Sequence, residues 1–419
     1  MLKEKEKKNL EKLTLKDYMK ALGPAIIVVA GIIGPGTITT MSVVGADHGF
    51  KALWIVTLAC IFAYFYQEPA TRITIRTGMS VLEGIRKFIG KPVSIFLFGT
   101  VLIGAIAFQA GNFTGAALAL NYFVPEISIT MWALTMAIAA LAIVWIGVYQ
   151  IIENINKVLI ALMIIAFVLT AFTAGPETVN IFREGFAFDT LGGDYWLILA
   201  LLATTMPPNI VLGLSSFIRA KYEQEKNINI HRELKLAKFD LRFSMAATLL
   251  ISSAIVISAG AIIHPQGITI EGAADMAEQL TPILGTYAGI LFSLGLWAAA
   301  FSSGIYQITL ASRFLNEAIG KPIDHKAGRS RIVMVLASLL PVAIILAFED
   351  VPISIIITAQ SLNGLALPLV AGTVLFLANN KRFLGNHVNN LWQNIAYSII
   401  LIVVSLLALR VFLSLFGVI

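Results

Sequence analysis

Long apolar stretches separated by short polar segments run through the whole chain. Each is about 20 residues long, the length that a helix needs to cross roughly 30 Å of hydrocarbon. We predict eleven membrane-spanning helices, at residues 22–46, 50–71, 93–123, 128–149, 156–175, 194–218, 243–264, 284–312, 331–348, 353–379 and 391–415. The pattern therefore predicts an all-α polytopic membrane protein in a lipid bilayer, with one transmembrane domain (22–419) after an N-terminal segment (1–21).

Two of these stretches are interrupted near their middle. Gly34-Pro35-Gly36-Thr37 lies in the first stretch and Met206-Pro207-Pro208-Asn209 in the sixth. Proline cannot donate to the carbonyl four residues earlier, so Pro207 leaves that of Ala203 without its helical partner. In hydrocarbon this is tolerated only where protein or a water-filled cavity surrounds the break. Two broken helices in corresponding halves are typical of the binding site of a secondary transporter.

The breaks are five spans apart, which indicates two halves that cross the membrane in opposite senses. We expect a five-plus-five inverted repeat, at residues 22–175 and 194–379, with residues 391–415 as an extra helix. Such a repeat predicts transport by alternating access around a site between the two breaks.

Composition and charge agree with a membrane protein. Hydrophobic residues make up 58% of the chain and charged residues only 13%, too few to cover a soluble globule of 419 residues. If the N-terminus is cytoplasmic, 27 of the 30 Lys and Arg residues fall in inner segments, as the positive-inside rule requires. The net charge of +6 therefore reflects membrane topology and not a nucleic-acid partner. We expect a cell-membrane protein whose C-terminus lies outside.

The sequence gives no sign of an enzyme. It lacks a nucleophile with a base at motif spacing, a phosphate-binding glycine loop and a cluster of His and Cys ligands, so no cofactor is expected. Glu68 and Arg72 are four residues apart near the inner end of the second span, and we expect them to form a structural ion pair.

Several motifs resemble the NRAMP family of divalent-metal transporters. The resemblance begins with Gly23-Pro24-Ala25 through Thr40 and Gly45-Ala46-Asp47-His48-Gly49, and continues through residues 50–90. It extends through Met206-Pro207-Pro208-Asn209 to Leu367-Pro368, and so covers nearly the whole chain. The resemblance implies the LeuT-like fold, which agrees with the inverted repeat.

The charged positions of the family motifs are neutral here. Where metal-transporting members have Asp-Pro-Gly-Asn, this chain has Gly34 and Thr37 in place of the two ligands. Pro208 replaces the His of the family's Met-Pro-His-Asn. In the third span, where proton-coupled members carry an Asp and a Glu, the matching stretch holds Gln109 and Asn112.

These departures leave the identity of the transported ion open. Helix N-termini at the two breaks, with no carboxylate beside them, favour a small oxyanion such as bicarbonate. Thr37 would cap the second half of the first span while donating to the anion. The alternative is a divalent metal cation of the Mg²⁺ or Mn²⁺ type, although its ligands stay unknown. The predicted substrate-binding residues are Gly34, Gly36, Thr37, Ala203, Met206, Asn209 and, by resemblance to the family, Gln360.

The eighth span contains two hydroxyl groups, Ser302 and Ser303. In LeuT-like transporters, hydroxyls at this depth complete a sodium site with carbonyls from the first break. Together with Gly31 they form a candidate sodium site, and Na⁺ is a candidate coupling ion. The alternative is that these small residues serve only close helix packing.

Overall fold

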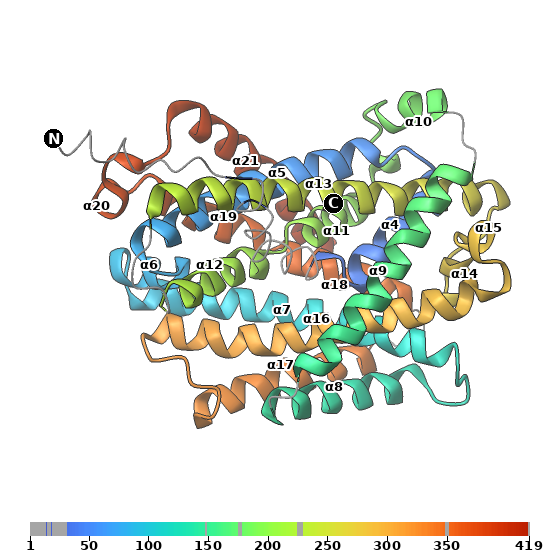
Figure 1. Ribbon diagram of the computed structural model, residues 1–419, viewed down its shortest axis with the longest axis horizontal. Coiled ribbons are helices and arrows are strands. Elements are labelled where there is room, and N and C mark those ends of the chain that lie inside the picture. The colour runs from blue at the N-terminus through green and yellow to red at the C-terminus, as the bar shows by residue number, and fades with distance from the viewer. Residues whose placement is uncertain are drawn as a thin grey trace.

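The computed structural model describes Thr14, Tyr18 and residues 32–146, 149–174, 178–223, 229–347 and 352–417. Within these ranges every regular element is a helix. The long helices lie side by side along the longest axis of the molecule, and shorter helices lie at both ends (Figure 1). Most of the predicted N-terminal segment (1–21) and the first half of the first span lie outside the described residues.

The described helices follow the predicted spans closely. Those of the first half are α4 (Pro35–His48), α5 (Leu53–Thr77), α6 (Val81–Phe88), α7 (Lys91–Asn121), α8 (Ile129–Ile146), α9 (Tyr149–Thr173) and α10 (Thr178–Gly185). Those of the second half are α11 (Tyr195–Thr205), α12 (Pro208–Glu223), α13 (Ile230–Ile262), α14 (Ala273–Glu278), α15 (Thr281–Leu284), α16 (Ala288–Ile319), α17 (Gly328–Ala347), α18 (Pro352–Gly364), α19 (Leu367–Ala378), α20 (Lys381–Leu384) and α21 (Leu391–Leu415).

Eight helical stretches among the described residues are long and apolar enough to cross a membrane. They correspond to spans three, four, six, seven, eight, nine, ten and eleven of the prediction. Helices α5 and α9 occupy the predicted second and fifth spans, and α4 is the second half of the first. An all-α membrane protein is therefore confirmed, whereas the count of eleven spans and the repeat boundaries stay predictions.

One predicted span is divided in the structure, and one polar segment between spans is helical. The tenth span was expected to be one helix, but it is divided into α18 and α19 at residues 365–366. Pro368 explains the division, because it cannot donate to the carbonyl of Gly364. The polar segment 219–242 is largely helical, since α12 continues to Glu223 and α13 begins at Ile230.

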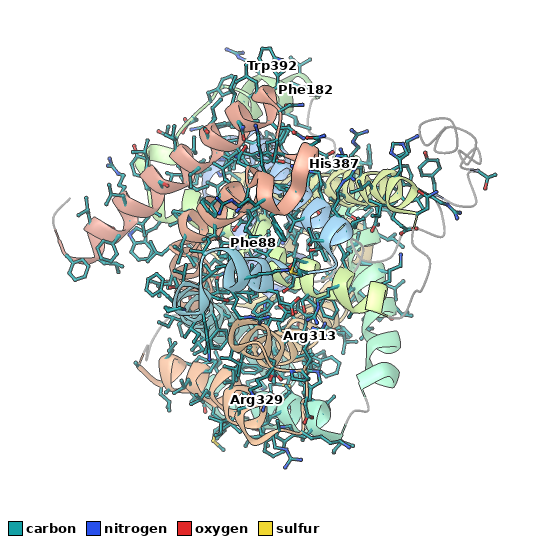
Figure 2. The ribbon with its side chains drawn as sticks, turned by 90° about the vertical axis from the view of Figure 1, so that its left-hand side faces the viewer. Phe88, Phe182, Arg313, Arg329, His387 and Trp392 are labelled. Atoms are coloured by element: carbon teal, nitrogen blue, oxygen red, sulfur yellow. The ribbon has the colours of Figure 1, made fainter. Side chains whose placement is uncertain are left out.

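The basic segments gather at one end of the molecule. Helices α6 and α20 lie at the left of Figure 1, whereas α10, α14 and α15 lie at the right. Figure 2 looks onto the left-hand end, where Arg313 and Arg329 lie near the ends of α16 and α17. We call this the basic end; by the positive-inside pattern it is expected to face the cytoplasm.

Close contacts between glycines and neighbouring helices hold α4 against α13. A methyl group at Gly45 would lie 2.6 Å from the carbonyl oxygen of Val256, and one at Gly260 would lie 3.1 Å from the backbone of Gly49. Membrane helices pack closely where small residues face each other. Helix α4, which carries the first break, is therefore fixed to the long helix α13.

A buried carboxylate joins three helices at the basic end. Glu317, near the end of α16, is only 1% exposed. It accepts hydrogen bonds from Ser80 Oγ (2.8 Å), at the start of α6, and from Ser216 Oγ of α12 (2.5 Å). Arg313 donates to the same Ser216 Oγ over 2.8 Å. The carboxylate thus ties α6 and α12 to α16.

The expected ion pair between Glu68 and Arg72 is present, with 3.2 Å between Oε1 and Nε. Lys238 of α13 lies 3.3 Å from the same carboxylate oxygen, and the hydroxyl of Tyr397 donates to Oε2 over 3.1 Å. The pair therefore links α5 to α13 and to the extra helix α21.

We predict that Glu317→Leu lowers the stability of the protein. The change leaves the buried hydroxyls of Ser80 and Ser216 without their charged acceptor, and we expect the melting temperature to fall by roughly 5 °C. Thermal unfolding of the detergent-purified protein measures this. Glu126→Leu, at an exposed position between α7 and α8, is the control and should melt as the wild type does. Equal melting of all three proteins would show that the carboxylate does not hold these helices together.

Candidate functional site

The first break ends where α4 begins. Gly34 is the N-cap of α4, and its N–H donates to the carbonyl of Ile32 over 2.8 Å. Pro35 follows as the first helical residue, where its missing N–H costs nothing. The predicted interruption is therefore confirmed on its described side.

The second break separates α11 from α12. Helix α11 ends at Thr205, Met206 has a non-helical backbone and α12 begins at Pro208. Pro207 and Pro208 leave the carbonyls of Ala203 and Thr204 without their usual helical donors. These carbonyls face the same layer of the molecule as the first break, because α4 and α11 pack against each other.

A hydroxyl pair joins the two breaks. Thr37 Oγ1 and Thr204 Oγ1 are 2.7 Å apart. The Thr37 hydroxyl also donates to the carbonyl of Ile32. The prediction that Thr37 caps α4 is wrong, because Gly34 occupies that position and the only hydroxyl proton of Thr37 goes to Ile32. Thr204 must then donate to Thr37, so Thr37 keeps no proton for an anion.

Gln360 of α18 reaches the first break. A methyl group at Gly36 would overlap the side-chain amide of Gln360, and one at Gly111 of α7 would lie 3.5 Å from Gln360 Nε2. The side chain is fully buried, and neither of its amide atoms has a hydrogen-bond partner among the described residues. The structure thus brings Gln360 together with Gly36, as the resemblance implied.

Ala203 and Met206 lie at the second break but in apolar surroundings. Both belong to the buried apolar cluster on the basic-end side of the site, and Ala203 packs against Gly364 of α18. Met206 is fully buried. Its place in this cluster agrees with a packing role, which a buried methionine often has.

A chain of amides fixes the direction in which Asn112 points. Gln109 Nε2 donates to the carbonyl of Gly304 over 3.0 Å. Gln109 Oε1 then accepts from Asn112 Nδ2 over 2.9 Å. Because a carbonyl can only accept, the order of these bonds leaves Asn112 Oδ1 free. This oxygen lies 3.9 Å from the place that a methyl group at Gly34 would take.

Asn209 points from α12 toward α16. Its Nδ2 donates to Gln307 Oε1 over 2.6 Å, and its Oδ1 has no partner in the part of the chain that the structure describes. Asn209 is fully buried, as predicted for a site residue. The hydrogen bonds that the structure shows for Asn209 and Thr37 go to other residues, Gln307 for the first and Ile32 and Thr204 for the second.

The candidate sodium site is only partly described. Gly31 lies outside the described residues. Ser303 Oγ lies 3.5 Å from the methyl position of Gly34, is buried and lacks a partner within the described ranges. Ser302 is more exposed than Ser303 and takes part in other interactions.

The unpaired polar groups of this layer include oxygens and two amide nitrogens, Gln360 Nε2 and Gln307 Nε2. Asn112 Oδ1, Asn209 Oδ1, Gln360 Oε1 and Ser303 Oγ are buried and unpaired among the residues described. Asn112 and Asn209 each use one amide hydrogen, in bonds to Gln109 and Gln307. No group of three His, Cys, Asp or Glu side chains that could hold a metal occurs in the described part of the chain. These amide and hydroxyl groups are uncharged, and they stay uncharged over the physiological pH range.

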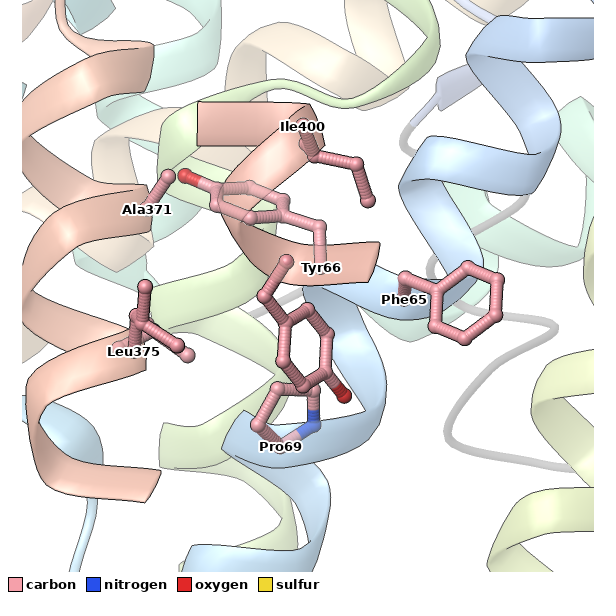
Figure 3. A pocket seen from close by; sticks show the side chains of 8 residues that line it. Phe65, Tyr66, Pro69, Ala371, Leu375 and Ile400 are labelled. Atoms are coloured by element: carbon pink, nitrogen blue, oxygen red, sulfur yellow. The ribbon is translucent and has the colours of Figure 1, made fainter. Parts of the chain in front are cut away.

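A small pocket lies elsewhere, between α5, α19 and α21 (Figure 3). Its walls include Phe65, Tyr66, Pro69 and Leu375. It contains none of the predicted substrate-binding residues. We therefore place the candidate site at the breaks and not in this pocket.

Comparison with known proteins shows the family. A family model described as natural resistance-associated macrophage protein-like matches residues 25–414. The chain belongs to the Nramp family. It is therefore a membrane transporter, as the two breaks and the resemblance in their motifs indicated.

Relatives of this Nramp-family chain match most of its length. Two proteins named divalent metal cation transporter MntH are each 25% identical to it. The one from Caldanaerobacter subterraneus subsp. tengcongensis is matched over 89% of this chain and 87% of its own length. The one from Bacillus subtilis is matched over 94% and 91%.

Solved structures show the same fold. The manganese transporter of Eremococcus coleocola has a TM-score of 0.79 at 16% identity, covering 94% of this chain and 86% of that one. MhsT, in complex with L-phenylalanine, has a TM-score of 0.62 at 19% identity, with coverage of 94% and 98%. The LeuT-like fold is confirmed.

The predicted substrate-binding set left out two amides of the membrane spans. Gln307 was not among the predicted site residues, yet it pairs with Asn209. Asn363, which was also not predicted, is fully buried beside Gly104 of α7. The sequence could have pointed to both residues, because polar side chains within a membrane span need hydrogen-bond partners or have a function.

We predict that Gly36→Ala reduces ion uptake without unfolding the protein. The new methyl group would push the flexible end of Gln360 out of the site. Loss of one ion–amide contact should slow uptake into proteoliposomes by about tenfold. Gly99→Ala is the matched control on α7, since a methyl group there meets nothing within 4 Å. Normal uptake by Gly36→Ala would remove Gln360 from the site.

Proposed function

We propose that this Nramp-family transporter carries a divalent metal cation of the Mg²⁺ or Mn²⁺ type, held at the breaks by neutral oxygens. Its relatives are named divalent metal cation transporters, and one solved neighbour is named a manganese transporter. These names favour the cation over the oxyanion that the uncharged motif suggested. The observation that carries the proposal is the free amide oxygen of Asn112 beside Gly34.

The arrangement of hydrogen bonds supports a cation. The carbonyl of Gly304 orders the amides of Gln109 and Asn112 so that an oxygen, and not an N–H, is left for a ligand. One amide hydrogen of Asn209 and the hydroxyl proton of Thr37 are likewise engaged, whereas Gln360 Nε2 has no partner among the described residues. An oxyanion needs donors, whereas a hard cation needs oxygens.

The neutral donor set also bears on how the cation is held. Without a carboxylate, the site cannot replace the full water shell of a divalent ion. Mg²⁺ usually keeps several waters, and amide, hydroxyl and carbonyl oxygens can bind it directly or through them. We therefore propose a partly hydrated cation, bound more weakly than a carboxylate site would bind it.

One observation favours a second candidate. Helix α4 begins at the break with no acidic residue in its first turn, and the positive end of its dipole is available to an anion. Bicarbonate is therefore kept as a competitor in the uptake test. The comparisons support neither bicarbonate nor sodium coupling.

We predict saturable uptake of Mg²⁺ and Mn²⁺ by the purified protein in proteoliposomes. Bicarbonate uptake is measured in parallel, with and without an inward sodium gradient. Neutral oxygens should give cation uptake with no accumulation of bicarbonate. Bicarbonate uptake without metal flux would overturn the proposal, and dependence of that uptake on sodium would restore the hydroxyl site at Ser303.

We further predict that Gly34→Asp strengthens divalent uptake. A side chain at this position has room, since its first carbon would lie 3.5 Å from Ser303 Oγ. The added carboxylate should lower the apparent KM for Mn²⁺ by about tenfold or more. Gly34→Asn, which has the same shape and no charge, is the matched control. An unchanged KM in Gly34→Asp would argue that the cation does not bind at this break.

A further inference from the structure

An unpaired amide lies beyond the central site, on the face of α18 that meets α7. Asn363 is fully buried, and neither its Oδ1 nor its Nδ2 has a hydrogen-bond partner among the described residues. A methyl group at Gly104 of α7 would lie 2.8 Å from Asn363 Oδ1. Because residue 104 is a glycine, the amide of Asn363 can pack directly against α7.

Asn363 lies one helical turn from Gln360. Residues three apart share one face of a helix, so both amides face α7. Gln360 meets Gly111 and Asn363 meets Gly104. The two glycines are seven residues apart on α7, which is about 10 Å along its axis. The two amides therefore form a row beside α7, and each of them lies against a glycine of that helix.

This row points toward the basic end. Helix α7 begins at Lys91 at that end, so Gly104 is closer to it than Gly111 is. Helix α18 runs toward the basic end, opposite to α7, since α19 and then α20 follow it. Asn363 is therefore the next polar side chain on this face from Gln360 toward the basic loops.

A buried amide with neither atom paired is costly, and apolar residues would pack the same space without that cost. A packing role accounts for the glycine but not for the amide. A ligand that enters this space would satisfy the amide, and the only polar ligand that the proposed function brings there is the transported ion with its waters.

We infer that Asn363 and Gly104 form a second binding station for the partly hydrated divalent cation, between the central site and the basic end. The inference rests on the proposed function. The cation leaves the oxygens at the breaks, passes Gln360 and is held at Asn363 by its amide oxygen, directly or through a retained water. A neutral station binds weakly enough to release the ion onward.

The test is Asn363→Leu in proteoliposomes, with Mg²⁺ and Mn²⁺ as the transported ions. Leucine fills the space of the amide but binds no cation. We expect the maximal uptake rate to fall by about tenfold, with the apparent KM within about twofold of the wild type, because entry to the central site is unchanged. We expect an equal or higher melting temperature, since a buried unpaired amide is removed.

Gly104→Ala tests the same station without removing the amide, and it serves if Asn363→Leu does not fold. Its methyl group would displace Asn363 Oδ1. Thr170→Val is the control. Like the amide of Asn363, the hydroxyl of Thr170 on α9 is a buried polar group without a partner in the described ranges, but it lies outside this row. We expect slow uptake in Gly104→Ala and normal uptake in Thr170→Val.

The outcomes separate this inference from the proposed function. Wild-type rates in both Asn363→Leu and Gly104→Ala, beside normal cation uptake by the wild type, would overturn the station and leave the function standing. Absence of divalent uptake by the wild type would overturn both. Slow uptake with an unchanged KM and no fall in melting temperature supports the station, because loss of a purely structural amide would lower the melting temperature and leave the rate unchanged.

Discussion

Two membrane helices are broken near their middle, and the backbone groups at these breaks lack their usual helical hydrogen-bond partners. The rest of the structure depends on how the surrounding helices accommodate these groups. Pro35, Pro207 and Pro208 interrupt two helices where a membrane would leave free backbone groups without water, unless protein or a cavity surrounds them. Helices α7, α16 and α18 bring amides and hydroxyls to the same layer as these breaks. The apolar clusters meet on either side of this layer, with Ile32 in one and Ile33 in the other. A polar layer between two apolar ones is the setting that an ion site needs.

The direction of the hydrogen bonds shows which atoms of the uncharged site are left for a ligand, which the sequence alone does not show. A neutral residue can serve either an anion or a cation, because an amide carries both donors and acceptors. The backbone orients two of the amides here. The carbonyl of Gly304 accepts one hydrogen of Gln109, whose side-chain oxygen accepts one hydrogen of Asn112, and Asn112 Oδ1 has no partner among the described residues. Under the proposed function, the absence of the family's carboxylate at Gly34 leaves neutral oxygens to hold the cation.

Local chemistry made the breaks and most helices predictable. Proline acts through its own backbone, so the ends of α11 and the start of α12 could be placed from Pro207 and Pro208 alone. The division between α18 and α19 had the same signal in Pro368, but the apolar residues around it read as one continuous span. Contacts between distant segments were not accessible in this way. That Thr37 would donate to Ile32 and accept from Thr204 depends on how two broken helices approach each other.

The positions of unpaired groups carry information that residue types alone do not. Gln109 and Asn363 are both amides buried in membrane helices, yet Gln109 donates to and accepts from its neighbours whereas Asn363 is unpaired in the described part of the chain. The first is explained by the structure that it orders. For the second, we infer a partner in the transported ion. A transporter must bind its ion at each point of the path without binding it tightly anywhere, and a row of neutral amides beside glycines meets that requirement better than a carboxylate would. The absence of charge that makes binding weak at the central site would then also let the ion leave each point of the path beyond it.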